Sequence, residues 1–287
     1  MSGPSIVPPG RLKSEFTQSF SEQEFVRTVD KIKDCIQKGE ASQVVPSIKF
    51  TAEYEGDLLQ TYRNLRTINP SSYMFYMHFD NVEIAGASPE TLVSLKNGIV
   101  STFPLAGTCK RTNDEDENKR LVAKLLADPK ELVEHEMLVD LGIADLNKVC
   151  EPESVNVDEY RVIKTCSHVY HIESKVKGKI KQGYDAFDAM SATLPAGTLS
   201  GAPRERAMEI IAEAEGEARD IYGGAVGYID FRGDIDLCIG IRMAVLRDGK
   251  VSVQAGAGIV AESIPENEYT ECCNKAKAML EAIRGGQ

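Results

Sequence analysis

The sequence predicts an α+β protein whose sheets are mostly antiparallel. Short runs rich in β-branched and aromatic residues follow one another from residue 73 to 103, and Asn97-Gly98 is a strong signal for a two-residue hairpin turn. Helical patterns come in pairs between such hairpins instead of alternating one by one with strands. No repeat and no low-complexity linker divides the chain. We therefore expect one domain over residues 16–287, after a disordered leader over residues 1–15 that is rich in Pro, Gly and Ser.

The composition is that of a soluble globular protein without a basic face. Of 287 residues, 42% are apolar and 27% are charged, and the net charge is −11. A strongly acidic chain is a poor partner for nucleic acid or an anionic membrane surface. No apolar run approaches the roughly 20 residues that span a bilayer. Seven cysteines without CxxC spacing predict reduced thiols and a cytoplasmic location.

The first helix is predicted from a capping-box pattern at Ser21-Glu-Gln-Glu24. Gly39 is a plausible stop, and a short strand over 43–45 and a helix over 56–66 follow. The apolar stripe of the first helix consists of Phe25, Val29, Ile32 and Ile36.

The middle and end of the chain alternate between hairpins and helices. We expect strands over 73–79, 82–87, 91–96 and 99–103, helices over 115–126 and 130–147, a strand pair over 168–180, and a helix over 184–192. A glycine-rich loop over 195–201 precedes a helix over 203–215, with Pro203 suited to its first position. A meander with strands over 226–231, 236–246 and 250–255 leads to a last helix over 266–283.

The stretch from Gln254 to Glu271 is the most informative for function. A strand ends in Gly256 and Gly258, whose lack of side chains exposes backbone N–H groups to an anion. Glu268 and Glu271 then lie i,i+3 on one helix face, where two carboxylates can hold a hard cation such as Mg²⁺. An anion site beside a metal site indicates a substrate that bears carboxylates.

A second carboxylate pair, Glu131 and Glu134, has the same spacing on the helix over 130–147. For both pairs the alternative is a solvated surface, because carboxylates in first helical turns are stabilised by the helix dipole without any ligand.

Two glycine-rich stretches resemble nucleotide-binding loops, and we reject that reading for both. Gly256 to Ala261 matches GxGxxA, but Glu266 and Glu268 would repel a pyrophosphate and the preceding elements are hairpins. The loop from Gly197 to Gly201 lacks a Walker lysine. It is either an anion loop at a helix N-terminus or an ordinary turn.

Arg242 lies inside the apolar run from Cys238 to Val245, so it either points outward or needs a buried anion. His78 and His168 fall in predicted strands and are expected only to pack. His171 is a candidate base if its side chain faces the same cavity.

Taken together, these segments resemble the chorismate-utilising enzymes, most closely the large subunit (component I) of anthranilate synthase. The matching stretches run in family order from about residue 20 to the end. They are Gly39-Glu-Ala-Ser-Gln43-Val-Val, Gly86-Ala-Ser-Pro-Glu90, Pro104-Leu-Ala-Gly-Thr108, Leu126-Ala-Asp-Pro-Lys-Glu131-Leu-Val-Glu134 with its continuation to Gly142, Ser167-His-Val-Tyr-His171, Pro195-Ala-Gly-Thr-Leu-Ser-Gly-Ala-Pro203, Tyr222-Gly-Gly-Ala-Val-Gly-Tyr228, Ile241-Arg242 and Gln254-Ala-Gly-Ala-Gly258.

The resemblance implies a fold and a division of roles. The fold is a sandwich of mostly antiparallel sheets with helices packed outside. Chorismate is held by Mg²⁺ on its ring carboxylate, and Glu90 and His171 lie near the leaving 4-hydroxyl and the ring C2 proton. The residues implied to bind the metal are Glu134 and Glu271, with Glu131 and Glu268 close by. Those implied to bind the enolpyruvyl carboxylate are Tyr222, Arg242, Gly256 and Gly258, and those lining the ring are Thr108 and Thr198.

Two positions sort this family by the nucleophile that it uses. Enzymes that add water at C2 carry a lysine base where this chain has Gln43, and the 4-amino branch typically has a lysine where this chain has Ala106. With neither lysine present, the resemblance implies that ammonia adds directly at C2, and that pyruvate leaves to give anthranilate, as in tryptophan biosynthesis. Alternatives are arrest at 2-amino-2-deoxyisochorismate, aminodeoxychorismate synthesis, or a non-catalytic chorismate-binding relative. The resemblance is also compatible with a glutamine amidotransferase partner subunit and with self-association of the chain.

The chain departs from the family in two respects. Where the family usually continues Arg-Asn after Gly142, this chain has Ile143-Ala144, which lack the polar side chains. Anthranilate synthases also carry a regulatory region before this domain, for which the sequence given has no counterpart. The implied reading is a catalytic domain without that region.

Overall fold

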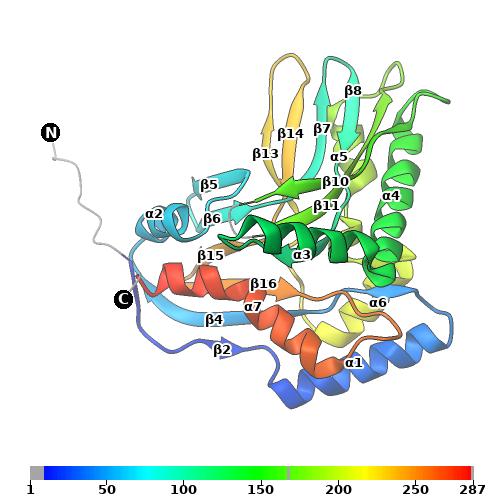
Figure 1. Ribbon diagram of the computed structural model, residues 1–287. Helices are drawn as coiled ribbons and strands as arrows, with labels where there is room; N and C mark the ends of the chain where they lie inside the picture. Colours follow the sequence, from blue (N-terminus) through cyan, green and yellow to red (C-terminus); the bar gives the residue numbers. More distant parts are fainter. Residues whose placement is uncertain (1–9, 167–168, 286–287) are drawn as a thin grey trace, which may run out of the picture. The chain divides into compact units, whose positions relative to one another are not determined.

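A computed structural model describes residues 10–166 and 169–285 (Figure 1). The described chain divides into two compact units. Unit 1 contains residues 10–88, 198–223 and 240–285, and unit 2 contains residues 89–166, 169–197 and 224–239. Each unit is built from separate stretches of chain, so no linker cuts the sequence into two consecutive parts. The single domain expected over residues 16–287 stays a prediction.

Unit 1 is built on an antiparallel sheet with the strand order β1-β4-β16-β15-β6-β5, and β2 also pairs with β4. A separate pair joins β3 to β12. The strands are β1 (Arg11–Leu12), β2 (Thr17–Gln18), β3 (Gln43–Val44), β4 (Ser47–Glu55), β5 (Tyr73–His78), β6 (Val82–Ser88), β12 (Gly201–Ala202), β15 (Met243–Arg247) and β16 (Lys250–Gly256).

The helices of unit 1 cover one face of this sheet. They are α1 (Glu22–Gln37), α2 (Leu59–Ile68), α6 (Arg204–Glu215) and α7 (Pro265–Ile283), and α7 lies along β16 (Figure 1). Alternate residues of β4 enter the core, from Ile48 to Tyr54, while Lys49 and Thr51 point to the opposite face. The capping box at Ser21 and Glu24 is confirmed, and the predicted stripe of α1 packs into this core.

Three predictions in unit 1 were wrong. Strand β4 was missed, although every second residue of it is buried. The helix predicted over 56–66 begins only at Leu59, after a turn at Asp57. Residues 11 and 12 pair with β4 as strand β1, so they are not part of a disordered leader; residues 1–9 of that leader lie outside the described residues.

Unit 2 is built on a second antiparallel sheet with the strand order β10-β11-β8-β7-β14-β13, and β9 also pairs with β11. Its strands are β7 (Thr91–Lys96), β8 (Ile99–Thr102), β9 (Leu105–Lys110), β10 (Asn156–Thr165), β11 (Val169–Lys179), β13 (Ala225–Ile229) and β14 (Ile235–Ile239). Its helices are α3 (Glu115–Ala127), α4 (Pro129–Val149) and α5 (Ala186–Thr193). A 3-10 turn over Gly197–Leu199 begins at the last residue of this stretch of unit 2 and continues into unit 1.

Helix α4 packs against β9 and β11, and one buried hydrogen bond joins it to the sheet. The side chains of His135 in α4 and Ser174 in β11 have no exposed surface, and His135 Nε2 lies 2.7 Å from Ser174 Oγ. Burial lowers the pKa of His135, and the guanidinium of Arg161 lowers it further. The imidazole is therefore neutral near pH 7, and it fixes the position of α4 on β11.

The strand assignments of unit 2 needed further corrections. The strand pair predicted over 168–180 is the single strand β11, and its partner β10 was missed. Strand β9 was also missed. The strand predicted over 236–246 is two strands, because β14 pairs in unit 2 and β15 pairs in unit 1. Arg242 lies between them with φ +52°, outside either strand.

The remaining predictions concern two histidines, one proline, the cysteines, membrane spans and the fold class. His78 ends β5 with an exposed ring 3.2 Å from Glu83 Oε1, so it does not simply pack. His168 lies outside the described residues. Pro203 precedes α6 as its N-cap instead of opening it. No disulfide joins cysteines in the described ranges, and none of the helices there is long and apolar enough to cross a membrane. The α+β class with antiparallel sheets is confirmed.

Candidate functional site

In unit 2, His171 is held by the strand beside it. Its Nδ1 lies 3.0 Å from the carbonyl oxygen of Gly107 and 3.0 Å from Thr108 Oγ1. A carbonyl oxygen only accepts hydrogen bonds, so Nδ1 carries the proton and donates it. Nε2 is then the basic nitrogen of the ring. The contacts give His171 the tautomer that a general base requires.

Gly107 is the residue that makes this contact possible. Pairing of β9 with β11 is irregular at this point, since His171 pairs with Thr108 while Ile172 pairs with Ala106. Gly107 takes φ +71°, a left-handed conformation that favours glycine. A Cβ at Gly107 would also lie 3.1 Å from Glu131 Oε2. The bulge therefore brings Glu131 of α4 and His171 of β11 to the same glycine.

The other predicted residues of unit 2 lie on neighbouring elements. Glu134 is one turn along α4 from Glu131, and both are half-buried. Ala106 is 8% exposed, so its methyl group fills space that a longer side chain would need. Glu90 immediately precedes β7, and its carbonyl oxygen accepts a hydrogen bond from Ile239 N at 3.0 Å.

In unit 1, Gly256 and Gly258 sit where other groups approach the backbone closely. A Cβ at Gly256 would meet Pro46 O at 2.7 Å and Tyr222 Oη at 3.2 Å, and one at Gly258 would meet Gln43 Nε2 at 2.8 Å. Gln43 is buried, and its strand β3 forms an isolated bridge from Val44 to Ile259. The two glycines therefore bring Tyr222 and Gln43 next to the turn predicted from the sequence.

Tyr222 is held by a buried ion pair that the sequence did not reveal. Arg219 Nε and Nη2 donate to the two oxygens of Glu215 at 2.8 and 2.5 Å, and the side chains are 12% and 3% exposed. Arg219 also donates to Leu199 O and Val45 O, both at 2.6 Å, and its guanidinium lies 5.6 Å from the Tyr222 ring centroid. Burial raises the pKa of Tyr222 well above its usual range, so its hydroxyl stays protonated.

Thr198 opens the segment that Arg219 holds. Its Oγ1 is buried and has no hydrogen-bond partner among the described residues. An unpaired buried hydroxyl is costly unless a ligand or water completes it. This orphaned group matches the role of a ring-lining residue that the resemblance implies.

Lys275 links the glycine turn to the carboxylates of α7. Its Nζ lies 2.5 Å from Glu271 Oε1 and 2.9 Å from Gly256 O. Arg242 Nη1 donates to the carbonyl oxygen of Lys275 at 2.6 Å, so Arg242 reaches the same helix. Glu268 is 7% exposed and lies one turn earlier. Lys275 was missed, although its i,i+4 spacing from Glu271 was a signal in the sequence.

Two of the candidate carboxylates lie on α4 and two on α7, and their chemical type suits Mg²⁺. Carboxylate oxygens are the protein ligands that Mg²⁺ prefers, with waters or substrate oxygens in the remaining positions. No group of three or more His, Cys, Asp or Glu side chains able to hold a metal ion occurs in residues 10–166 and 169–285. Glu271 is already neutralised by Lys275, so an ion bound there would compete with the ammonium.

The departure at Ile143-Ala144 leaves α4 intact. The helix continues unbroken to Val149, with Ile143 half-buried and Ala144 exposed. The next residue, Asp145, forms an ion pair with Lys148, with Oδ1 and Nζ 2.8 Å apart. The two apolar replacements therefore do not disturb the helix that carries Glu131 and Glu134.

Comparison with known proteins identifies the family. Residues 3–281 match the family model of chorismate binding enzymes. Anthranilate synthase component 1 of Aquifex aeolicus is 51% identical over 265 residues, covering 92% of this chain and 54% of the relative. That of Acetivibrio thermocellus is 48% identical, covering 97% and 57%. The chain thus spans about half the length of these curated relatives.

Solved structures give the same result. The crystal structure of anthranilate synthase component I from Streptococcus pneumoniae superposes with a TM-score of 0.87 at 44% identity, covering 97% of this chain and 62% of that one. A putative 2,3-dihydroxybenzoate-specific isochorismate synthase from Bacillus anthracis has a TM-score of 0.82 at 29% identity, covering 96% and 75%. This chain therefore belongs to the family of chorismate binding enzymes.

Proposed function

We propose that this chain catalyses the amination of chorismate by ammonia, giving anthranilate and pyruvate with the help of Mg²⁺. Support comes from its identity to several proteins named anthranilate synthase component 1 and from the residues at the family's motif positions. The observation that carries the proposal is the tautomer of His171. An imidazole whose proton sits on Nδ1 leaves Nε2 unprotonated, and an unprotonated ring nitrogen is what removal of the C2 proton requires.

The reaction has two steps whose atoms balance. In the first, the nitrogen of ammonia forms a bond to C2, the ring double bonds shift, and the 4-hydroxyl leaves as water after taking a proton from Glu90. The ammonium group formed at C2 then releases one proton, which balances the proton that Glu90 gave. This gives 2-amino-2-deoxyisochorismate. In the second, His171 Nε2 takes the C2 proton, the C3–O bond breaks, and the enolate of pyruvate leaves. The enolate takes up one proton at its methylene carbon to become pyruvate, which balances the proton taken by His171. The aromatic product is anthranilate.

Binding of the enolpyruvyl carboxylate falls to residues of unit 1. The protonated hydroxyl of Tyr222 and the backbone N–H groups at Gly256 and Gly258 are the donors that the resemblance implies, with Arg242 supplying positive charge. Each group is already fixed before the substrate arrives, since Arg242 is anchored on α7 and Tyr222 beside Arg219. Fixed donors lose little entropy on binding.

The choice of ammonia over water rests on Gln43. Its buried amide has no lone pair basic enough to deprotonate water, whereas ammonia attacks without a base. Ala106 gives no amine to attack C2 in its place. Ammonia would come from a glutamine amidotransferase subunit in the cell, or from ammonium salts in the test tube.

Mg²⁺, when bound, would withdraw electrons from the ring carboxylate and make C2 more electrophilic. The residues that would hold it are the carboxylates that the resemblance implies, Glu131 and Glu134 on α4 and Glu268 and Glu271 on α7. Their donor chemistry fits the ion, as described above.

Product identification tests this proposal directly. The purified chain is incubated with chorismate, MgCl₂ and an ammonium salt at alkaline pH. The products are separated by chromatography and identified by mass spectrometry. We expect anthranilate and equimolar pyruvate. A 4-amino product would assign the chain to aminodeoxychorismate synthesis, and 2-amino-2-deoxyisochorismate alone would show arrest after the first step. Binding of chorismate without any product would leave a non-catalytic relative.

A further inference from the structure

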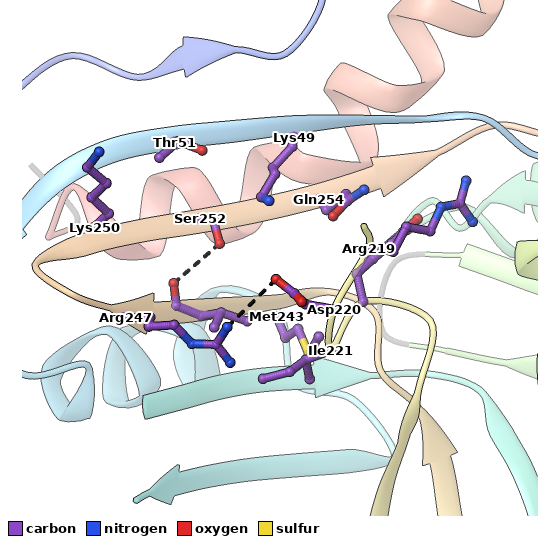
Figure 2. A pocket seen from close by; sticks show the side chains of 12 residues that line it. Lys49, Thr51, Arg219, Asp220, Ile221, Met243, Arg247, Lys250, Ser252 and Gln254 are labelled. Carbon is purple, nitrogen blue, oxygen red and sulfur yellow. Dashed lines mark hydrogen bonds and ion pairs between the residues drawn. The ribbon is translucent and has the colours of Figure 1, made fainter. Parts of the chain in front are cut away.

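A pocket of about 210 Å³ lies on the face of the unit 1 sheet that carries Lys49 and Thr51, opposite to the core (Figure 2). Twelve residues of β4, β15, β16 and the segment before Tyr222 line it. None of them, apart from Tyr222, has a part in the proposed reaction. The pocket is smaller than the cavities that hold drug-sized ligands, so its size suits a compact molecule.

The rim of the pocket is basic in a protein of net charge −11. Lys49, Arg247 and Lys250 reach it from three different strands, against a single carboxylate, Asp220 (Figure 2). Arg219 also belongs to the lining, but its guanidinium points away and is saturated by its own buried partners. Three cations are therefore available at the rim.

These three cations are only loosely paired within the protein. Arg247 lies 3.7 Å from Asp220, Lys250 lies 3.8 Å from Glu53, and all four side chains are 42–60% exposed. Lys49 pairs with Glu217 at 3.3 Å, and these side chains are 25% and 45% exposed. Exposed ion pairs at such distances stabilise a protein little, so a ligand anion displaces the carboxylates at low cost.

Below the cations the pocket is apolar. Ile221, Met243 and Val245 contribute aliphatic and thioether surface, and Tyr222 contributes its ring. The hydroxyl groups of Thr51 and Ser252 add polar contacts along one side, on β4 and β16. An inorganic ion would leave this apolar surface in contact with water. An anion with an apolar body would remove the surface from water, which is favourable.

We propose that this pocket binds a small organic acid with a flat, apolar body and two carboxylates. One carboxylate pairs with Arg247 and Lys250 and the other with Lys49, while the body packs on Met243, Val245 and the Tyr222 ring. The binding claim stands without the proposed function.

Isothermal titration calorimetry with isophthalate, a rigid aromatic dicarboxylate, tests the proposal. The unmodified chain should bind isophthalate saturably. Its neutral isostere isophthalamide and inorganic phosphate should bind at least tenfold more weakly, since one lacks the charges and the other the apolar body. Absence of saturable isophthalate binding would overturn the proposal, and equal affinity for phosphate would overturn the assigned ligand class.

Variants locate the site. The double substitution Arg247→Gln/Lys250→Gln should weaken isophthalate binding by about tenfold or more, because two charge-assisted contacts are lost. Lys277→Gln is the control. It removes an exposed charge from α7, whose partner Glu281 lies 4.0 Å away, and it should leave the affinity within twofold. An unchanged affinity in the double variant would refute the assignment.

A third variant separates this pocket from the proposed substrate site. Arg242→Gln removes the cation expected to bind the enolpyruvyl carboxylate and should leave isophthalate affinity unchanged. Loss of isophthalate binding in Arg242→Gln, with retention in the double variant, would place the probe at the substrate site and overturn the proposal. Anthranilate formation decides the proposed function separately, so the two ideas fail independently.

Discussion

The buried ion pair between Arg219 and Glu215 gives the sharpest prediction about stability. Arg219→Ala would remove two hydrogen bonds to Glu215 and two to the carbonyl oxygens of Leu199 and Val45. Glu215, 3% exposed, would keep its bonds from the backbone N–H and hydroxyl of Ser47, at 2.8 and 2.7 Å, but would lose its cation. A carboxylate left buried without its cation costs about 3–5 kcal/mol of folding free energy.

Urea denaturation followed by circular dichroism measures this loss. We expect a lower midpoint with an unchanged slope, since the same surface is exposed on unfolding. Arg247→Ala is the matched control, because its ion pair is exposed and 3.7 Å long, and it should cost less than about 1 kcal/mol. The double variant Arg219→Met/Glu215→Gln should recover part of the loss, because no unpaired charge remains buried.

A loss below about 1 kcal/mol in Arg219→Ala would refute this reasoning. It would mean that Glu215 reaches water or another donor once the guanidinium is gone. The pair would then not be what holds Tyr222 and the segment after Thr198 in place. The same variant is expected to raise KM for chorismate, since Tyr222 loses the guanidinium beside its ring.

Three further predictions concern the site and its support. Gly107→Ala should lower kcat about tenfold more than Gly98→Ala does. Both glycines have positive φ, +71° and +79°, but of the two only Gly107 has another side chain where a Cβ would lie. Steady-state kinetics compare the two variants, and equal losses of kcat would contradict a role for Gly107 in placing His171. Burial lowers the pKa of His135 in the folded state, so the folding free energy falls as the pH drops below about 6.5, the pKa of an unfolded histidine, toward the lower pKa of the folded state. His135→Gln should flatten this part of the curve of folding free energy against pH, measured by urea titrations. An unchanged pH dependence would assign the loss of stability to other groups. Lys275→Met removes the ammonium group 2.5 Å from Glu271. Calorimetry without chorismate should then show about two- to fivefold tighter Mg²⁺ binding. Weaker or unchanged Mg²⁺ binding would argue against Glu271 as a ligand.

The sequence predicted elements best where local signals were complete. Helix α1 had a capping box, an apolar stripe and a glycine stop, and its bounds differ little from the expected ones. Strand β4 was missed although Pro46 separates it from the short strand before it. Its alternation from Ile48 to Tyr54 was visible but was not used. The apolar run around Arg242 was read as one strand, because the switch between two sheets takes only a few residues.

The candidate residues were found by motif, and their supports were not. Spacing could pair Glu268 with Glu271, but Arg219 holds Val45 and Leu199, which are far from it in the chain. Likewise the proton on His171 Nδ1 depends on a carbonyl group in another strand, which no local pattern encodes. Sequence reasoning therefore located the chemistry, while the long-range contacts that orient it needed coordinates.

The central proposal is that this chain turns chorismate and ammonia into anthranilate with His171 as the base. A continuous anthranilate fluorescence assay, with chorismate, Mg²⁺ and ammonium, tests it on the unmodified chain and on His171→Ala. We predict steady anthranilate formation that requires ammonium, and an at least hundredfold slower rate in the variant, with 2-amino-2-deoxyisochorismate accumulating. No anthranilate from the folded unmodified chain, or an equal rate in the variant, would contradict it.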